Sequence, residues 1–156
     1  MPEITLARAE AIIDAIFAKA TENRWKPMAV AVTNQGSSVI AFKKQDDSSM
    51  IRFEMAFGKC YGALALGRST SLVRLRAEQR PLFMDYLFKA SDGRIFAEDG
   101  GMLVRDADGT LLGAVGVTGE RPERDEELAA YGIRAAGFLT DEDAAAATGR
   151  QIRMEN

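Results

Sequence analysis

Two polar turn sequences constrain the fold more than any other feature of this chain. Asn34-Gln35-Gly36-Ser37 separates two apolar, valine-containing runs, and Asp106-Ala107-Asp108-Gly109 separates two more. Glycine takes the positive φ of a tight turn at no steric cost, and a short polar turn between apolar runs is typical of a β-hairpin. The four strands predicted in this way cover residues 28–33, 39–42, 102–105 and 110–118. Because a hairpin joins antiparallel strands, the sheet is expected to be mostly antiparallel.

Most of the remaining chain has helical spacing of its apolar residues. The helices predicted from this spacing cover residues 5–20, 49–66, 69–79, 82–89 and 122–137. A fifth, short strand is predicted at 94–97, after the Asp92-Gly93 turn. The expected fold class is therefore α+β, with a mostly antiparallel five-stranded sheet flanked by helices.

The length of the chain fits one domain. Its 156 residues are 47% hydrophobic, which is enough for an ordinary core without a disulfide or metal. We assign residues 1–138 to a single domain and residues 139–156 to a C-terminal tail. Thr140 and Asp143 have the spacing of a capping box, which predicts a short helix in this tail. The alternatives are a loose tail and one that packs on a partner subunit.

Composition excludes several kinds of site. The chain has no histidine and one cysteine, so Ser-His-Asp and Cys-His sites and an intrachain disulfide are ruled out, and no metal site is expected. The net charge of −3, with both signs spread along the chain, gives no reason to expect nucleic acid as a partner. No basic and apolar leader opens the sequence, and no apolar run approaches the ~20 residues of a membrane span. A cytoplasmic location without membrane contact is the expectation.

Three stretches, in this order, resemble a known family. They are Lys59-Cys60-Tyr61 with Gly67-Arg68-Ser69-Thr70, then Gly100-Gly101, then Leu112-Gly113-Ala114-Val115-Gly116-Val117-Thr118-Gly119 followed by Asp125. In this order they are similar to the GlcG/HbpS family, a group of haem-degrading-like domains also called DUF336. The resemblance covers about residues 5–138.

The resemblance implies an antiparallel sheet flanked by helices and assembly into dimers, tetramers or octamers. Some members bind haem, and a related domain forms the C-terminal part of the PduO-type corrinoid adenosyltransferases. Others belong to catabolic gene clusters for small organic or aromatic-derived acids. This chain departs from the family pattern at residues 43–47 and 52–54, and Ser69 replaces the proline of the family's Gly-Arg-Pro-Thr stretch. These departures lie around the pocket that the resemblance implies.

The residues themselves support a site for a small acid. Arg52 and Lys59 are seven positions apart, so they share one face of the predicted helix and can bind a carboxylate. Backbone N–H groups of Gly100 and Gly101 could stabilise an oxyanion. The candidates for proton transfer are Lys59, Asp125 and Glu54, because burial raises the pKa of a carboxyl group and lowers that of an amine.

The stretches that resemble the family add Arg68, Thr118 and Tyr61 as ligand-binding candidates. The first functional hypothesis is therefore a small-ligand-binding protein, with isomerase, tautomerase or lyase chemistry on an organic acid and no required cofactor.

Two alternatives remain open. Haem could be bound, with Cys60 or Met55 as the axial ligand, since cysteine and methionine ligate haem iron. The third possibility is a non-catalytic accessory protein whose role depends on forming a homo-oligomer.

Overall fold

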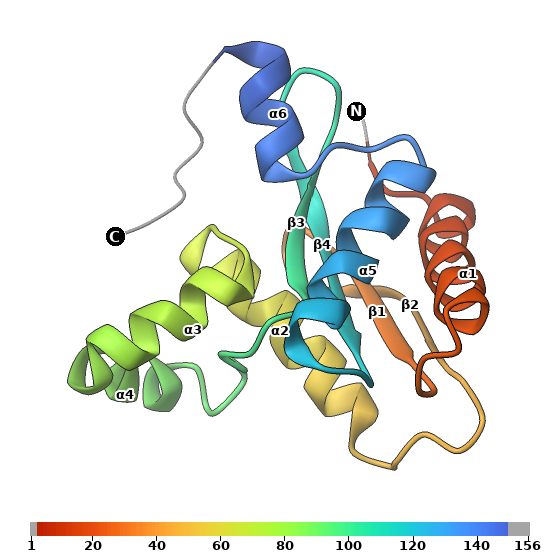
Figure 1. Ribbon diagram of the computed structural model, residues 1–156. Coiled ribbons are helices and arrows are strands. Elements are labelled where there is room, and N and C mark those ends of the chain that lie inside the picture. Colours follow the sequence, from red (N-terminus) through yellow and green to blue (C-terminus); the bar gives the residue numbers. More distant parts are fainter. Residues whose placement is uncertain (1–2, 150–156) are drawn as a thin grey trace.

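The computed structural model describes residues 3–149 (Figure 1). The helices in this part are α1 (Leu6–Glu22), α2 (Arg52–Leu66), α3 (Thr70–Gln79), α4 (Pro81–Ala90), α5 (Pro122–Ala135) and α6 (Asp141–Thr148). The strands are β1 (Ala29–Asn34), β2 (Val39–Lys44), β3 (Gly101–Arg105) and β4 (Leu111–Thr118). No helix in this part is both long enough and apolar enough to cross a bilayer.

The sheet is antiparallel throughout, in the order β2-β1-β4-β3. Both predicted hairpins are present, β1 with β2 and β3 with β4. The two hairpins join through β1 and β4, where Ala31 lies opposite Gly116. The predicted α+β class with a sheet flanked by helices is confirmed.

Helices cover both faces of the sheet (Figure 1). Helices α1 and α5 pack together on one face, over a core of branched side chains that includes Ile12, Ile16 and Val115. Helix α2 crosses the other face, where all the buried side chains but that of Leu103 are small: Ala31, Ala56, Cys60, Ala63 and Ala114. A Cβ on Gly116 would overlap the carbonyl oxygen of Ala56. Small residues therefore let the backbone of α2 lie close to the sheet.

The predicted strand at 94–97 is wrong, and within residues 3–149 the sheet has four strands rather than five. This segment packs against α2 instead: the Phe96 N–H donates to the Gly58 carbonyl oxygen at 3.1 Å. A Cβ on Gly58 would lie 2.8 Å from the Phe96 Cβ, so the glycine permits the contact. Ile95 is buried with Val73 and Met84 beneath α3 and α4. The apolar pattern thus reflects burial against helices and not pairing with the sheet.

The start of the predicted tail is helical and packs on the domain. The side chains of Thr140 and Asp143 form the predicted capping box at the start of α6. The Arg105 N–H donates to the Leu139 carbonyl at 2.9 Å, and Arg105 Nε lies 2.6 Å from Asp141 Oδ1. These contacts join the tail to β3. Residues 150–156 of the predicted tail lie outside the described residues.

Candidate functional site

A buried ion pair lies where β4 leads into α5. Helix α2 carries Lys59, which is 1% exposed, and its Nζ lies 3.2 Å from Asp125 Oδ2 in the first turn of α5. Lys59 Nζ also donates to the Val117 carbonyl oxygen at 2.7 Å. The other oxygen of Asp125 accepts the Glu120 N–H at 3.0 Å. The pair therefore joins α2, the end of β4 and the start of α5.

The glycine pair permits the backbone to pass close to Lys59. Gly100 has a φ of +123°, which other residues rarely adopt, and a Cβ there would lie 2.9 Å from Lys59 Nζ. A Cβ on Gly101 would overlap the Lys59 carbonyl oxygen. The Gly101 N–H already donates to Thr70 Oγ1 at 2.8 Å. The expected oxyanion role of Gly101 therefore requires correction, because its N–H group is engaged by Thr70.

Burial moves the two pKa values of the pair toward each other. Loss of hydration raises the pKa of Asp125 to about 6, although the Lys59 charge opposes the rise. Loss of hydration lowers the pKa of Lys59, and the Asp125 charge opposes that fall, with smaller effects from Glu98 and Asp99. A carboxyl group and an amine with converging pKa values exchange a proton more readily than the same groups in water.

Arg52 brings a second cation to the same end of β4. Its Nη1 donates to Thr118 Oγ1 at 3.3 Å, and Thr118 directly follows Val117, whose carbonyl binds Lys59. Arg52 Nε is buried without a hydrogen-bond partner. Within residues 3–149, Arg52 forms no ion pair with a carboxylate. Since buried polar groups are nearly always hydrogen-bonded, the free Nε of Arg52 indicates capacity for an anionic ligand.

The other candidates from the sequence lie apart from the pair. Glu54 is exposed on α2, and Tyr61 is half-buried, with its ring centroid 6.1 Å from that of Phe57. Arg68 is buried just after α2, where its Nε donates to the Leu66 carbonyl at 3.2 Å. The structure therefore brings together Lys59, Asp125, Gly100, Arg52 and Thr118.

The sulfur atoms proposed as haem ligands differ in their surroundings. Cys60 is fully buried between α2 and the sheet, with its Sγ 3.5 Å from the Ala31 carbonyl oxygen. Burial raises the pKa of the Cys60 thiol, so this residue is held as a neutral thiol and does not fit an axial thiolate. Met55 is half-buried on α2.

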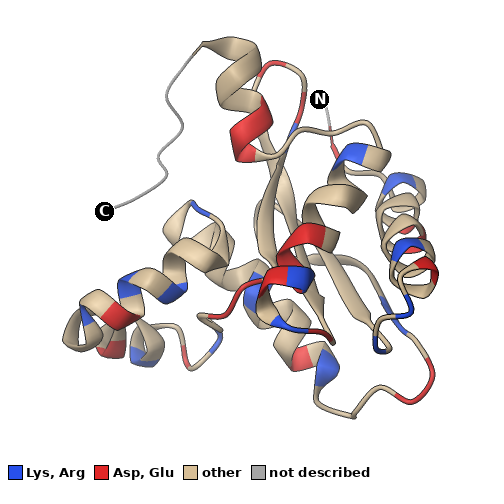
Figure 2. Cartoon of the chain, viewed as in Figure 1, with Lys and Arg blue, Asp and Glu red and all other residues tan. Residues whose placement is uncertain are grey.

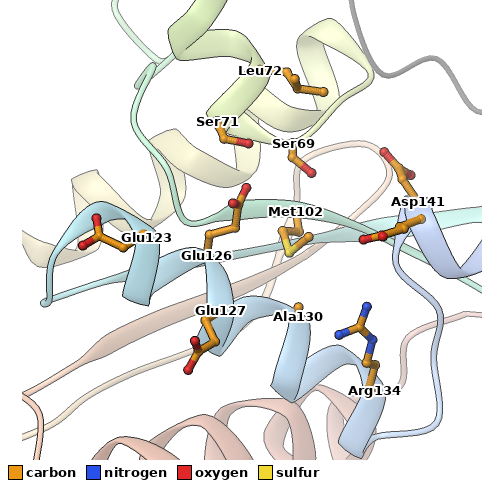
Figure 3. Close-up of a pocket in the computed structure, with 11 residues that line it drawn as sticks. Ser69, Ser71, Leu72, Met102, Glu123, Glu126, Glu127, Ala130, Arg134 and Asp141 are labelled. Atoms are coloured by element: carbon orange, nitrogen blue, oxygen red, sulfur yellow. The ribbon is translucent and has the colours of Figure 1, made fainter.

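A cleft that the sequence did not predict lies between α3, α5 and α6 (Figure 3). Its volume is about 410 Å³. Its walls consist of Ser69, Ser71, Leu72, Met102, Glu123, Glu126, Glu127, Ala130, Arg134, Asp141 and Glu142. Acidic residues gather at the start of α5 and of α6 (Figure 2). The glutamates of α5 were visible in the sequence, but they are also typical of any helix N-terminus. Four separate elements form the cleft, so no local pattern reveals it.

Sequence comparison decides the family. Residues 4–134 match the family model described as haem degrading protein HbpS-like. The chain belongs to the HbpS-like family. The resemblance drawn from residues 59–70, 100–101 and 112–125 is thereby confirmed.

Relatives of this HbpS-like chain include an uncharacterized 15.0 kDa protein from the dhaT-dhaS intergenic region of Citrobacter freundii. It is 31% identical over 126 residues, which are 81% of this chain and 87% of that protein. Among solved structures, the chain resembles the Klebsiella pneumoniae protein ORFY with a TM-score of 0.78 and 25% identity, over 87% of this chain and 92% of that one.

Two further structures share the fold at lower identity. A PduOC–haem complex has a TM-score of 0.78 at 21% identity, covering 89% of this chain and 99% of that one. HbpS has a TM-score of 0.75 at 22% identity, covering 88% of this chain and 92% of that one.

Proposed function

We propose that this HbpS-like chain binds a small organic acid at Arg52 and moves a proton on it with the Lys59–Asp125 pair. The observation that carries the proposal is the buried Arg52 Nε without a partner. Arg52 also donates to Thr118, which follows Val117, and the Val117 carbonyl oxygen accepts from Lys59. A guanidinium binds a carboxylate through two parallel hydrogen bonds. We expect the ligand to enter by displacing the Arg52–Thr118 hydrogen bond, which at 3.3 Å is long.

The proposed chemistry uses the two charges in complementary roles. The Asp125 carboxylate accepts a proton from the carbon next to the ligand's carbonyl group, and Lys59 donates a hydrogen bond to the carbonyl oxygen that gains the electron pair. Return of the proton to another atom of the same ligand completes a tautomerisation, with no net change in atoms or electrons. Loss of a leaving group from the same intermediate would give a lyase instead.

Calorimetric titration with pyruvate and lactate tests the binding step. We expect Arg52→Gln to weaken binding by about tenfold or more, because a charge-assisted bidentate contact is lost. Arg52→Lys keeps the charge but not the paired geometry, so we expect an intermediate affinity. Arg24→Gln, at an exposed position on the turn after α1, is the matched control and should bind as the unaltered chain does. Equal affinity for all four proteins would overturn the proposal.

A second candidate function is haem handling, favoured by the fold shared with the PduOC–haem complex. The described residues offer Met55 and Tyr61 as ligand types outside the core, whereas Cys60 does not fit. Titration with haemin tests this candidate through the Soret band. A saturable band that shifts in Met55→Leu or Tyr61→Phe, and not in Cys60→Ala, would support it. A band that is absent, or unaffected by both variants, would exclude ligation by these residues.

A further inference from the structure

We propose that the cleft between α3, α5 and α6 is a second ligand site, which takes a small zwitterion with an amine and a carboxylate, of the amino-acid class. Neither Lys59 nor Arg52 is among the residues that line this cleft. The cleft is therefore separate from the organic-acid site, and ligand binding in the cleft does not require that site.

The α3 wall of the cleft offers hydrogen-bond donors to a carboxylate. Ser69 is 8% exposed, and its hydroxyl points toward the space above Met102 (Figure 3). Within the part of the chain that the structure describes, this hydroxyl has no hydrogen-bond partner. Ser69 is the N-cap residue of α3 and yet makes no capping hydrogen bond. The N–H groups of Leu72 and Val73 donate to the Ser69 carbonyl oxygen at 2.9 and 3.2 Å. Within the described residues, the N–H groups of Thr70 and Ser71 are left without a partner at the positive end of the helix dipole, beside the Ser71 hydroxyl.

The opposite wall offers a carboxylate to an ammonium group. Glu126 of α5 is half-buried, and its side chain reaches toward α3 across the floor of the cleft (Figure 3). No ion pair of Glu126 is found among the described residues. The other charges that could neutralise it are engaged elsewhere, since Arg134 binds Asp143 at 2.9 Å and Arg105 binds Asp141 at 2.6 Å. The only cation that lines the cleft among the described residues, Arg134, is paired with Asp143, and Glu123, Glu127, Asp141 and Glu142 also line it, so the α5 side of the cleft favours a positively charged group.

The floor between the two poles is apolar. Met102 of β3 lies between Ser69 and the α5 wall, and Ala130 of α5 adds a second apolar side chain (Figure 3). A volume of about 410 Å³ is enough for one small organic molecule. A simple acid would face the Glu126 carboxylate, and a simple amine would leave the α3 donors unused. A molecule with both groups satisfies both walls.

Titrations with three ligands that share the same branched alkyl chain test the proposal. The probes are L-leucine, 4-methylpentanoate, which lacks the amine, and 3-methylbutylamine, which lacks the carboxylate. Binding is followed by shifts of backbone amide signals in NMR spectra. We expect L-leucine to perturb the amides of Ser69–Leu72 and of the first turns of α5, and to bind about tenfold more tightly than either analogue.

Substitutions in the α3 wall and in the α5 wall test whether each wall contributes to ligand binding. We expect Glu126→Gln and Ser69→Ala each to weaken L-leucine binding, Glu126→Gln by about tenfold. Glu22→Gln on α1 and Ser38→Ala in the β1–β2 turn make the same substitutions elsewhere and should leave binding unchanged. Absence of shifts at about 10 mM L-leucine, equal binding of either analogue, or unaltered binding in both cleft variants would overturn the proposal. None of these results depends on Arg52 or Lys59.

Discussion

At the scale of single residues, the Lys59–Asp125 pair is stable only while both members are present. Removing one charge leaves the other buried without a partner, which typically costs about 3–5 kcal/mol, whereas removing both costs much less. We therefore expect Lys59→Met and Asp125→Asn each to lower the free energy of unfolding strongly, and the double variant to lower it by less than the sum. Urea denaturation of the four proteins measures the coupling.

A matched control uses the exposed pair of Lys89 and Asp85 on α4, whose charged atoms are 2.8 Å apart. We expect Lys89→Met to change stability little, because solvent screens exposed pairs. Additive effects of Lys59→Met and Asp125→Asn would contradict the close contact of the buried pair.

The raised pKa of Asp125 predicts a pH dependence of stability. The folded chain holds this proton more tightly than the unfolded chain, whose pKa lies near the ordinary value of 3.8. The contribution of Asp125 to the free energy of unfolding is therefore largest at low pH and is lost as pH rises to about 6. Carbon-detected NMR of the Asp125 carboxyl group measures its titration directly. A midpoint near 3.8 would contradict the effect of burial.

At the scale of elements, the glycine pair before β3 sets how closely the backbone passes Lys59. A Cβ on Gly101 would overlap the Lys59 carbonyl oxygen and lie 2.7 Å from Thr70 Cγ2. We expect Gly101→Ala to lower the free energy of unfolding by about 2 kcal/mol or more, because backbone has to move. Gly36→Ala is the control, since its added Cβ would meet only Asn34 Oδ1, at 3.5 Å. Equal losses in the two variants, measured by urea denaturation, would contradict this role of Gly101.

The sequence predicted those elements whose signals are local. The hairpin turns at 34–37 and 106–109 and the Thr140–Asp143 capping box depend on neighbouring residues, and the structure contains all three. The prediction of a strand at 94–97 was wrong because apolar residues indicate that a segment is buried, but not which element it packs against. Here the partner is α2, through Gly58.

The same distinction applies to the candidate site. Family stretches and helical spacing pointed to Lys59, Asp125, Gly100 and Arg52, which the fold brings to one end of β4. Glu54 was predicted as a site residue by the same reasoning, but its position around the helix axis leaves it exposed to solvent. The cleft that contains Ser69 and Glu126 depends on how four elements pack, which residue spacing along the chain does not encode.

At the scale of the whole molecule, exposed apolar side chains support the expected homo-oligomer. Leu82 and Tyr86 on α4 are 88% and 70% exposed. Contact with a second copy would remove this surface from water. We expect light scattering coupled to gel filtration to give a mass above one chain, and Leu82→Glu to lower it. A monomer at all concentrations, or an assembly unaffected by Leu82→Glu, would contradict a role of α4 in assembly.

The proposed function requires the Lys59–Asp125 pair to move a proton on an organic acid bound by Arg52. The most direct measurement is the exchange of the pyruvate methyl protons for deuterium in D₂O, followed by proton NMR. We expect the protein to accelerate exchange by about a hundredfold over buffer. We expect the double variant of Lys59→Met and Asp125→Asn, which loses less stability than either single variant, to abolish the acceleration while remaining folded. Exchange at the buffer rate with the unaltered protein, or equal acceleration by the double variant, would contradict proton transfer by the pair.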